Sequence, residues 1–217
     1  MKDKEERNWQ VADTKVFWGE IAPTDHILQI YENEESFLCT LEGFVLSGLE
    51  AGECVVLIAT PAHINALRDR LSQKELAIVD LMADDQLIFL DAEETLFKFM
   101  VNGWPDAMLF DQTISAIVKR ATNRNRSLRA FGEMVALLWA KGEKSATVHL
   151  EILWNRICEM QHFCLFCAYP SNGFTQEANL SADTICCAHA KMISGDQKSS
   201  TNIFYKSVSQ QQSGVVT

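Results

Sequence analysis

The chain has 217 residues, 47% of them hydrophobic, and a formal net charge of -10. That length and composition allow one ordinary domain with a sizeable core, and the acidic surface argues against nucleic acid or anionic membranes as partners because phosphates would be repelled. No apolar run approaches the roughly 18 residues of a spanning helix, and the charged start "MKDKEERNWQ" lacks the apolar region of an export signal. The sequence therefore favours a cytoplasmic protein whose seven cysteines are mostly buried and reduced.

Apolar runs rich in β-formers alternate with segments of helical periodicity along most of the chain. The runs predict strands at 26–31, 54–60, 86–92, 127–134 and 162–170. Helices are predicted at 36–52, 62–73, 75–85, 93–103, 106–124, 135–142, 143–161 and 181–193. This alternation predicts an α/β fold, with a mainly parallel central sheet of about five or more strands and helices on both faces.

The two ends of the chain differ in composition from the predicted sheet domain at 25–193. Residues 1–24 form a polar N-terminal extension, in which "TKVFWGEIA" would add a helix or an edge strand. Residues 194–217 are rich in Ser and Gln, so we expect most of that C-terminal tail to be disordered.

The loop after the first strand, "YENEES", stands where a nucleotide-binding P-loop would stand. A working P-loop needs glycines whose N–H groups face the phosphates, a lysine, and a hydroxyl for magnesium. Three glutamates take their place here, and no Lys or Arg occurs between Lys15 and Arg68. We therefore expect no phosphate binding at this loop, with Asn33 as the cap of the following helix and Ser36 in its first turn.

Two cysteine groups resemble metal sites only superficially. Cys164 and Cys167 are three apart on a predicted strand, so their side chains should point to opposite faces. The pair Cys186-Cys187 with His189 is also an unlikely zinc site because adjacent cysteines rarely share one metal. We accordingly predict neither a metal site nor a cofactor. The basic run at 119–129 is interpreted as the solvated end of a helix rather than a DNA contact.

Glu133 follows a buried strand directly after Gly132, in "RAFGEMV". A P-loop ATPase keeps its second acidic motif at this place, and such a carboxylate could be a general base, a helix cap or the partner of a buried donor. Without a nucleotide loop, we favour a structural or ligand-orienting role. The chain also lacks a GxSxG elbow and a GxGxxG turn, which argues against a hydrolase and a dinucleotide enzyme.

Several segments together resemble the MEDS family, the methanogen/methylotroph DcmR sensory domain. They are "DHILQIYENEESFLCTLEGFVLSGLEAGECVVLIATPAHINALRDRL", "LDAEETLFKFMVNGWPD", "RAFGEMVALLWAKG", "LEILWN" and "FCLFCAYP", spread in order over about residues 25–193. The resemblance implies a RecA/KaiC-like scaffold whose nucleotide loop has degenerated and which has been reused to sense hydrocarbon derivatives. Family members are often fused to an output module, and none is evident in this sequence.

We therefore expect a non-catalytic sensory domain that binds a small, partly apolar organic ligand at the carboxyl edge of the sheet. It would relay the signal through a histidine kinase, another regulator or its own homo-oligomer. The alternative is a protein-interaction module that assembles with a kinase or regulator without a small ligand; an enzyme with unrecognised chemistry is a third option. The residues predicted to line the ligand site are Tyr31, Thr60, His63, Glu133, Trp139 and Tyr169.

Overall fold

A computed structural model describes residues 9–12, 18, 21–173, 185, 189, 191–194 and 202–206 of the chain. Its centre is an eight-stranded sheet with the order β1-β10-β9-β2-β8-β7-β3-β4. The strands are β1 (Trp9–Ala12), β2 (His26–Tyr31), β3 (Cys54–Ala59), β4 (Leu87–Asp91), β7 (Leu128–Gly132), β8 (Cys164–Pro170), β9 (Lys191–Ser194) and β10 (Asn202–Lys206).

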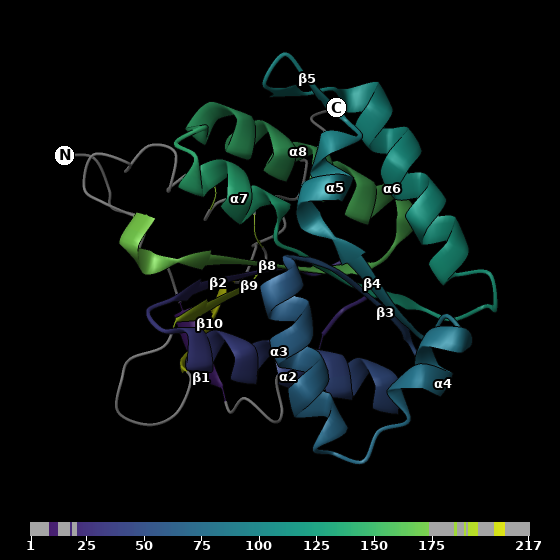
Figure 1. The fold of residues 1–217 in the computed structure, drawn as a ribbon. Coiled ribbons are helices and arrows are strands. Elements are labelled where there is room, and N and C mark those ends of the chain that lie inside the picture. The colour runs from purple at the N-terminus through teal and green to yellow at the C-terminus, as the bar shows by residue number, and fades with distance from the viewer. Residues whose placement is uncertain are drawn as a thin grey trace, which may run out of the picture.

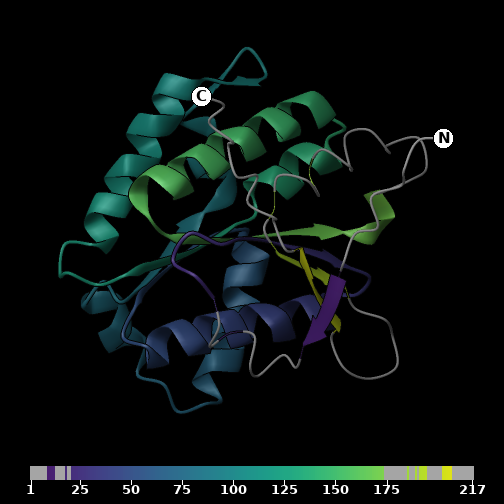
Figure 2. The same cartoon turned by 180° about the vertical axis from the view of Figure 1, so that it is seen from behind.

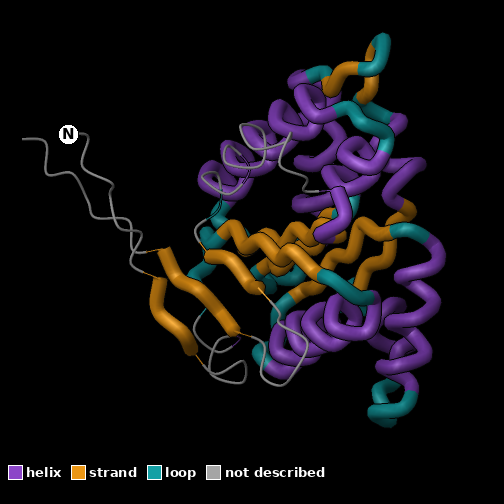
Figure 3. The backbone as a smooth tube through the Cα atoms, turned by 90° about the vertical axis from the view of Figure 1, so that its left-hand side faces the viewer, coloured by secondary structure: helices purple, strands orange, loops and turns teal. Residues whose placement is uncertain are grey.

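Helices cover both faces of this sheet (Figure 1). One face carries α2 (Glu34–Glu50), α3 (Pro61–Ser72) and α4 (Ile78–Ala83). The other carries α5 (Ala92–Phe97), α6 (Ala107–Ala121), α7 (Met134–Ala140) and α8 (Lys144–Gln161). Each helical layer encloses its own hydrophobic core against the sheet, which Figure 3 shows between the two layers.

The six strands from β9 to β4 pair in parallel, and the antiparallel strands β10 and β1 extend the sheet at the β9 edge (Figure 2). All five predicted strands are present and differ from prediction only at their ends. Burial on both faces explains why strands such as β3 are continuous apolar runs. The predicted α/β fold class is thus confirmed.

The predicted helix at 93–103 is wrong in its second half. α5 ends at Phe97, and a small hairpin of β5 (Met100–Val101) and β6 (Trp104–Pro105) follows. Asn102 and Gly103 form its turn with φ of 51° and 78°. Two central residues with positive φ define the tight hairpin turn that Asn-Gly favours. The sequence "VNGW" therefore indicated a hairpin, but the helical periodicity of the preceding residues led to the prediction of a helix.

The C-terminal predictions differ from the structure at two strands, although Ile185 within the predicted helix is helical. The expected helix at 181–193 ends in β9, and residues 202–206 of the expected disordered tail form β10. Strand β9 pairs with the backbone of β2, whose edge would otherwise have unpaired N–H and C=O groups. Most of the remaining tail and most of "TKVFWGEIA" lie outside the described residues, although Trp18 is helical and packs on Phe44 and Phe166.

Side-chain caps fix the places where strands give way to helices. The oxygens of Asn33, Thr60 and Asp91 each accept a hydrogen bond from a backbone N–H in the first turn of the following helix. The predicted cap at Asn33 is confirmed, with Ser36 N–H donating to its Oδ1 at 2.8 Å. Among the described residues, no helix combines the length and apolarity needed to cross a bilayer.

Helix α2 passes very close to the sheet at Gly48. A Cβ at this position would lie 2.9 Å from Cγ2 of Val55 and 3.2 Å from Cδ of Arg129. Neither neighbour can easily move: Val55 is fully buried on β3, and Arg129 is fixed by a 2.7 Å bond from Nε to Glu53 and by the ring of Phe44. The close approach therefore requires glycine at position 48 although it lies within a helix.

We expect Gly48→Ala to destabilise the protein. Alanine would favour the helix by about 1 kcal/mol, but crowding in a well-packed core costs about 1–3 kcal/mol, so the net change should be a loss. Urea denaturation measures the free energy of unfolding. The control is Glu50→Ala on the exposed end of the same helix, expected to change that free energy by less than about 0.5 kcal/mol. A Gly48→Ala variant more stable than wild type would contradict the close approach.

Candidate functional site

At the carboxyl edge of the sheet, the helices that follow the neighbouring strands β3 and β7 leave toward opposite faces. Ligand sites of parallel α/β sheets commonly form at such points. Glu133, directly after β7, reaches across to the first residue after β3. Its Oε2 accepts the backbone N–H of Thr60 at 2.7 Å, and its Oε1 accepts the Thr60 hydroxyl at 3.4 Å. One carboxylate thus joins the starts of α7 and α3.

His63 in the first turn of α3 connects this carboxylate to a second one. Its Nδ1 lies 2.8 Å from Oε1 of Glu133, and its Nε2 lies 2.5 Å from Oε1 of Glu34 in α2. Burial alone would lower the pKa of His63, but the two carboxylates outweigh burial and raise that pKa above its ordinary value. The imidazolium form is therefore stabilised between two negative charges.

Tyr31, the last residue of β2, lies beside the group formed by Glu34, His63 and Glu133. Its ring stacks on Phe37 with centroids 4.7 Å apart, and Phe37 meets the ring of His63 edge-on at 4.9 Å. Burial, with the charges of Glu34 and Glu133, raises the pKa of Tyr31 well above its ordinary value, so the phenol stays neutral. The structure therefore brings together four of the six predicted site residues. We call Tyr31, Glu34, Thr60, His63 and Glu133 the edge network.

Trp139 and Tyr169, the other two predicted site residues, belong to the core under α7 and α8. Their ring centroids are 6.0 Å apart, and both side chains are buried. The hydroxyl of Tyr169 donates to Oε1 of Glu151 in α8. Trp139 also has the ammonium of Lys144 5.6 Å above its ring.

Glu151 is the centre of a buried polar group that the sequence analysis did not identify. His26, Cys167 and His189 surround it, and all four side chains are buried. Burial raises the pKa of Glu151 to about 8 and lowers the pKa of His189 to about 4. Burial also lowers the pKa of His26 and raises that of Cys167. A carboxylate one residue after Leu150, on the apolar side of α8, was the available sequence signal.

The cysteine prediction is confirmed in its geometry. Cys164 faces the core under α2 and Cys167 faces the core under α8, so the two thiols lie on opposite sides of the sheet. Four arginines of the basic run at 119–129 are ion-paired with acidic residues. They are Arg120 with Asp85, Arg124 and Arg126 with Asp84, and Arg129 with Glu53.

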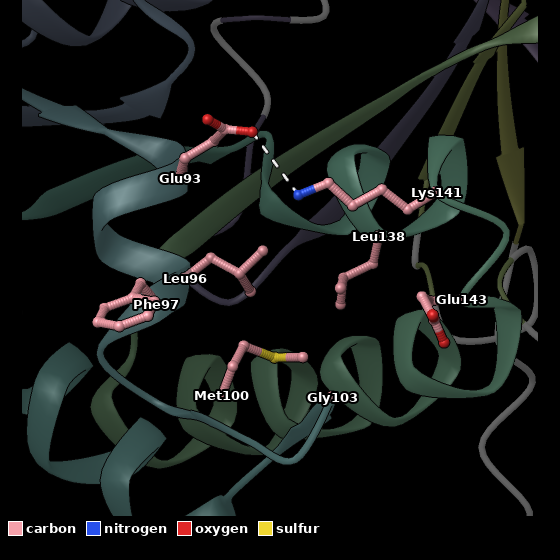
Figure 4. A pocket seen from close by; sticks show the side chains of 8 residues that line it. All are labelled: Glu93, Leu96, Phe97, Met100, Gly103, Leu138, Lys141 and Glu143. Carbon is pink, nitrogen blue, oxygen red and sulfur yellow. Dashed lines mark ion pairs between the residues drawn. The ribbon is translucent and has the colours of Figure 1, made fainter.

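A cavity of about 250 Å³ opens between α5, the β5–β6 hairpin and α7. Its walls are mostly apolar, and an ion pair of 3.6 Å between Glu93 and Lys141 spans it (Figure 4). The lining residues are Glu93, Leu96, Phe97, Met100, Gly103, Leu138, Lys141 and Glu143. None of the six predicted site residues lines this cavity, since the hairpin that forms one wall was expected to be helical.

Glu133→Gln preserves the size of the side chain and removes its charge. We expect the pKa of His63 to fall toward its ordinary value, and stability near pH 6 to drop by roughly 1–3 kcal/mol. Pairing with the carboxylates raises the pKa of His63 in the folded state. The ion pair therefore contributes fully to the free energy of unfolding below the unfolded pKa of about 6.5, and this contribution is lost as pH rises through the raised folded-state pKa. The stability difference from wild type should therefore narrow as pH rises from about 6 to about 8.

An NMR pH titration of the His63 ring, with urea denaturation at each pH, measures both effects. The control Glu94→Gln removes one charge from an exposed site and should alter neither the pKa of His63 nor the pH dependence of stability. Identical His63 titration curves in wild type and Glu133→Gln would contradict the pairing.

Comparison with known proteins agrees with the fold. A crystal structure of a KaiC-like protein from the hyperthermophilic archaeon Pyrococcus horikoshii is similar with a TM-score of 0.56 and 10% identity, covering 89% of this chain and 84% of that one. A search of curated proteins gave no match. The model of the MEDS family (MEthanogen/methylotroph, DcmR Sensory domain) matches residues 25–190, which is most of the sequence. The chain therefore belongs to the MEDS family of sensory domains.

Proposed function

We propose that this sensory domain binds a small, partly apolar organic molecule in the cavity between α5 and α7, without catalysis. The observation that carries the proposal is the mixed lining of the cavity, with the apolar side chains of Leu96, Met100 and Leu138 and one ion pair. Apolar walls with few polar groups are typical of small-molecule sites. A volume of about 250 Å³ is below the roughly 300–1,000 Å³ of drug-sized pockets, which favours a small ligand such as a short hydrocarbon derivative.

The ion pair at this cavity is weak enough to rearrange. The side chains of Glu93 and Lys141 are 65% and 57% exposed, and exposed pairs contribute only about 0–1 kcal/mol. A ligand with a polar end could therefore replace one partner at little cost. Its apolar part would gain about 25 cal/mol for each Å² removed from water.

Helix α7 supplies the route from the cavity to the rest of the domain. Leu138 and Lys141 contact the cavity near its C-terminal end, and Glu133 at its N-terminal end bonds to Thr60 and pairs with His63. A ligand that shifts α7 would change the edge network, and with it the starts of α3 and α2. In this proposal Glu133 orients the helices around the site, and a kinase, another regulator or a second copy of the chain reads the change.

Exposed apolar residues support the second candidate, a protein-interaction module. Phe97, Val101, Trp104 and Met108 follow one another along the end of α5, the hairpin and the start of α6, and Phe97 is 83% exposed. Exposed apolar groups of this kind commonly mark protein interfaces. Either function would use the hairpin, as the wall of a cavity in one case and as a contact surface in the other.

A thermal-shift screen with short alcohols, aldehydes and haloalkanes tests ligand binding. A ligand at 100 times its dissociation constant stabilises by about 2.7 kcal/mol, which should raise the midpoint by roughly 5–10 °C for a chain of this length. Met100→Trp should fill the cavity and abolish the shift. Met160→Trp, at an exposed position of α8, is the matched control and should keep it.

The outcomes separate the two functions. No shift with any compound, together with concentration-dependent self-association that Phe97→Ser abolishes, would favour the interaction module over the ligand sensor. A shift that survives in Met100→Trp would place the ligand outside this cavity and contradict the proposed site.

A further inference from the structure

The group at His26, Glu151, Cys167 and His189 has the composition of a transition-metal site. Two imidazoles, one thiol and one carboxyl converge from β2, α8, β8 and the segment before β9. Their ligating atoms all lie within 4.8 Å of one another, and no side chain is more than 4% exposed. Nitrogen and sulfur donors in a set of four are those that zinc prefers, with a carboxylate oxygen accepted as well.

The spacing of the donor atoms fits a tetrahedral metal, although the 3.4 Å between His26 and Cys167 also suits a hydrogen bond to sulfur. Nε2 of His26 lies 3.4 Å from Sγ of Cys167 and 3.5 Å from Oε2 of Glu151, and Nε2 of His189 lies 3.6 Å from the same oxygen. Metal–ligand bonds of about 2.0–2.3 Å at tetrahedral angles separate neighbouring ligand atoms by about 3.3–3.6 Å. The two nitrogen–oxygen distances exceed the roughly 2.7–3.2 Å of ordinary hydrogen bonds.

The second atoms of two of these groups are already engaged, which directs the remaining atoms inward. Nδ1 of His189 lies 2.6 Å from the carbonyl oxygen of Ile185 and donates to it, so Nε2 keeps its lone pair. Oε1 of Glu151 accepts the hydroxyl of Tyr169. Nε2 of His189 and Oε2 of Glu151 are then buried without a hydrogen-bond partner, a costly arrangement that a bound cation would relieve.

We propose that His26, Glu151, Cys167 and His189 bind one divalent transition-metal ion, with zinc the best match, and that Tyr169 positions Glu151 for it. Two neutral imidazoles, one thiolate and one carboxylate balance a charge of +2, so the bound site is neutral overall, as an apolar core requires. Four protein donors leave no open position for substrate, which makes the site structural. The ion would fasten β2, β8, α8 and the segment before β9 together, independently of the ligand cavity.

The metal content of the purified, untagged full-length chain tests this site. After expression in zinc-supplemented medium, elemental analysis should give one zinc per wild-type chain. Cys167→Ala should lower that ratio at least about tenfold, since it removes one donor. The control is Cys164→Ala, a buried cysteine on the same strand but the opposite face, which should keep the full equivalent.

Cobalt binding covers the case in which Cys167→Ala does not fold. Wild-type protein stripped with a chelator and titrated with Co²⁺ should develop a thiolate-to-cobalt absorption band with tetrahedral visible bands. Cys164→Ala should give the same spectrum, and Tyr169→Phe should bind about 10–100-fold more weakly because it loses the hydrogen bond to Glu151.

Wild-type protein with neither zinc nor a thiolate–cobalt band would overturn the proposal, as would a Cys167→Ala variant that folds and holds metal at the wild-type ratio. If the wild-type chain holds one equivalent of another transition metal and Cys167→Ala loses it, the proposed site is supported and only the identity of the ion changes.

Discussion

The carboxylate of Glu133 is the interaction on which the arrangement of the carboxyl edge depends. Strands β3 and β7 are neighbours in the sheet, but the helices that follow them diverge to opposite faces. Glu133 connects the two strand ends by accepting from the main chain at the start of α3 and pairing with His63. His63 also pairs with Glu34. The ion pairs of Glu34, His63 and Glu133 therefore connect α2, α3 and α7, which follow three different strands.

The same arrangement explains how two of the three glutamates after β2 are tolerated. Glu34 pairs with His63, and Glu35 forms two bonds of 3.0 and 3.1 Å to Arg70 of α3. The negative charges of Glu34 and Glu35 are therefore balanced by cations of the neighbouring helix rather than by residues within the loop. The sequence predicted that this loop does not bind phosphate, but the partners of Glu34 and Glu35 are about thirty residues away, so only the fold identifies them.

Short-range patterns predicted the five central strands because burial on both faces leaves continuous apolar runs, and they predicted the cap at Asn33 because capping is local. They also brought Thr60, His63 and Glu133 into one hypothesis, since ends of parallel strands share an edge. They failed for β9 and β10, which exist through pairing with distant backbone, and for Glu151, whose surroundings come from three other segments. Tyr169 lies apart from the edge network because alternation along β8 directs its ring to the core.

The strand order has a consequence for how the chain reaches its fold. Strand β2 is made early, but its two neighbours, β8 and β9, begin only at Cys164 and Lys191, and β1 pairs with β10 near the far end of the sequence. Such long-range pairings require the closure of large loops, which loses conformational entropy before stabilising contacts form. These pairings therefore form slowly. During synthesis the first half of the sheet must therefore persist with the edges of β2 open, and these edges are where an incomplete chain is most exposed to association with other chains.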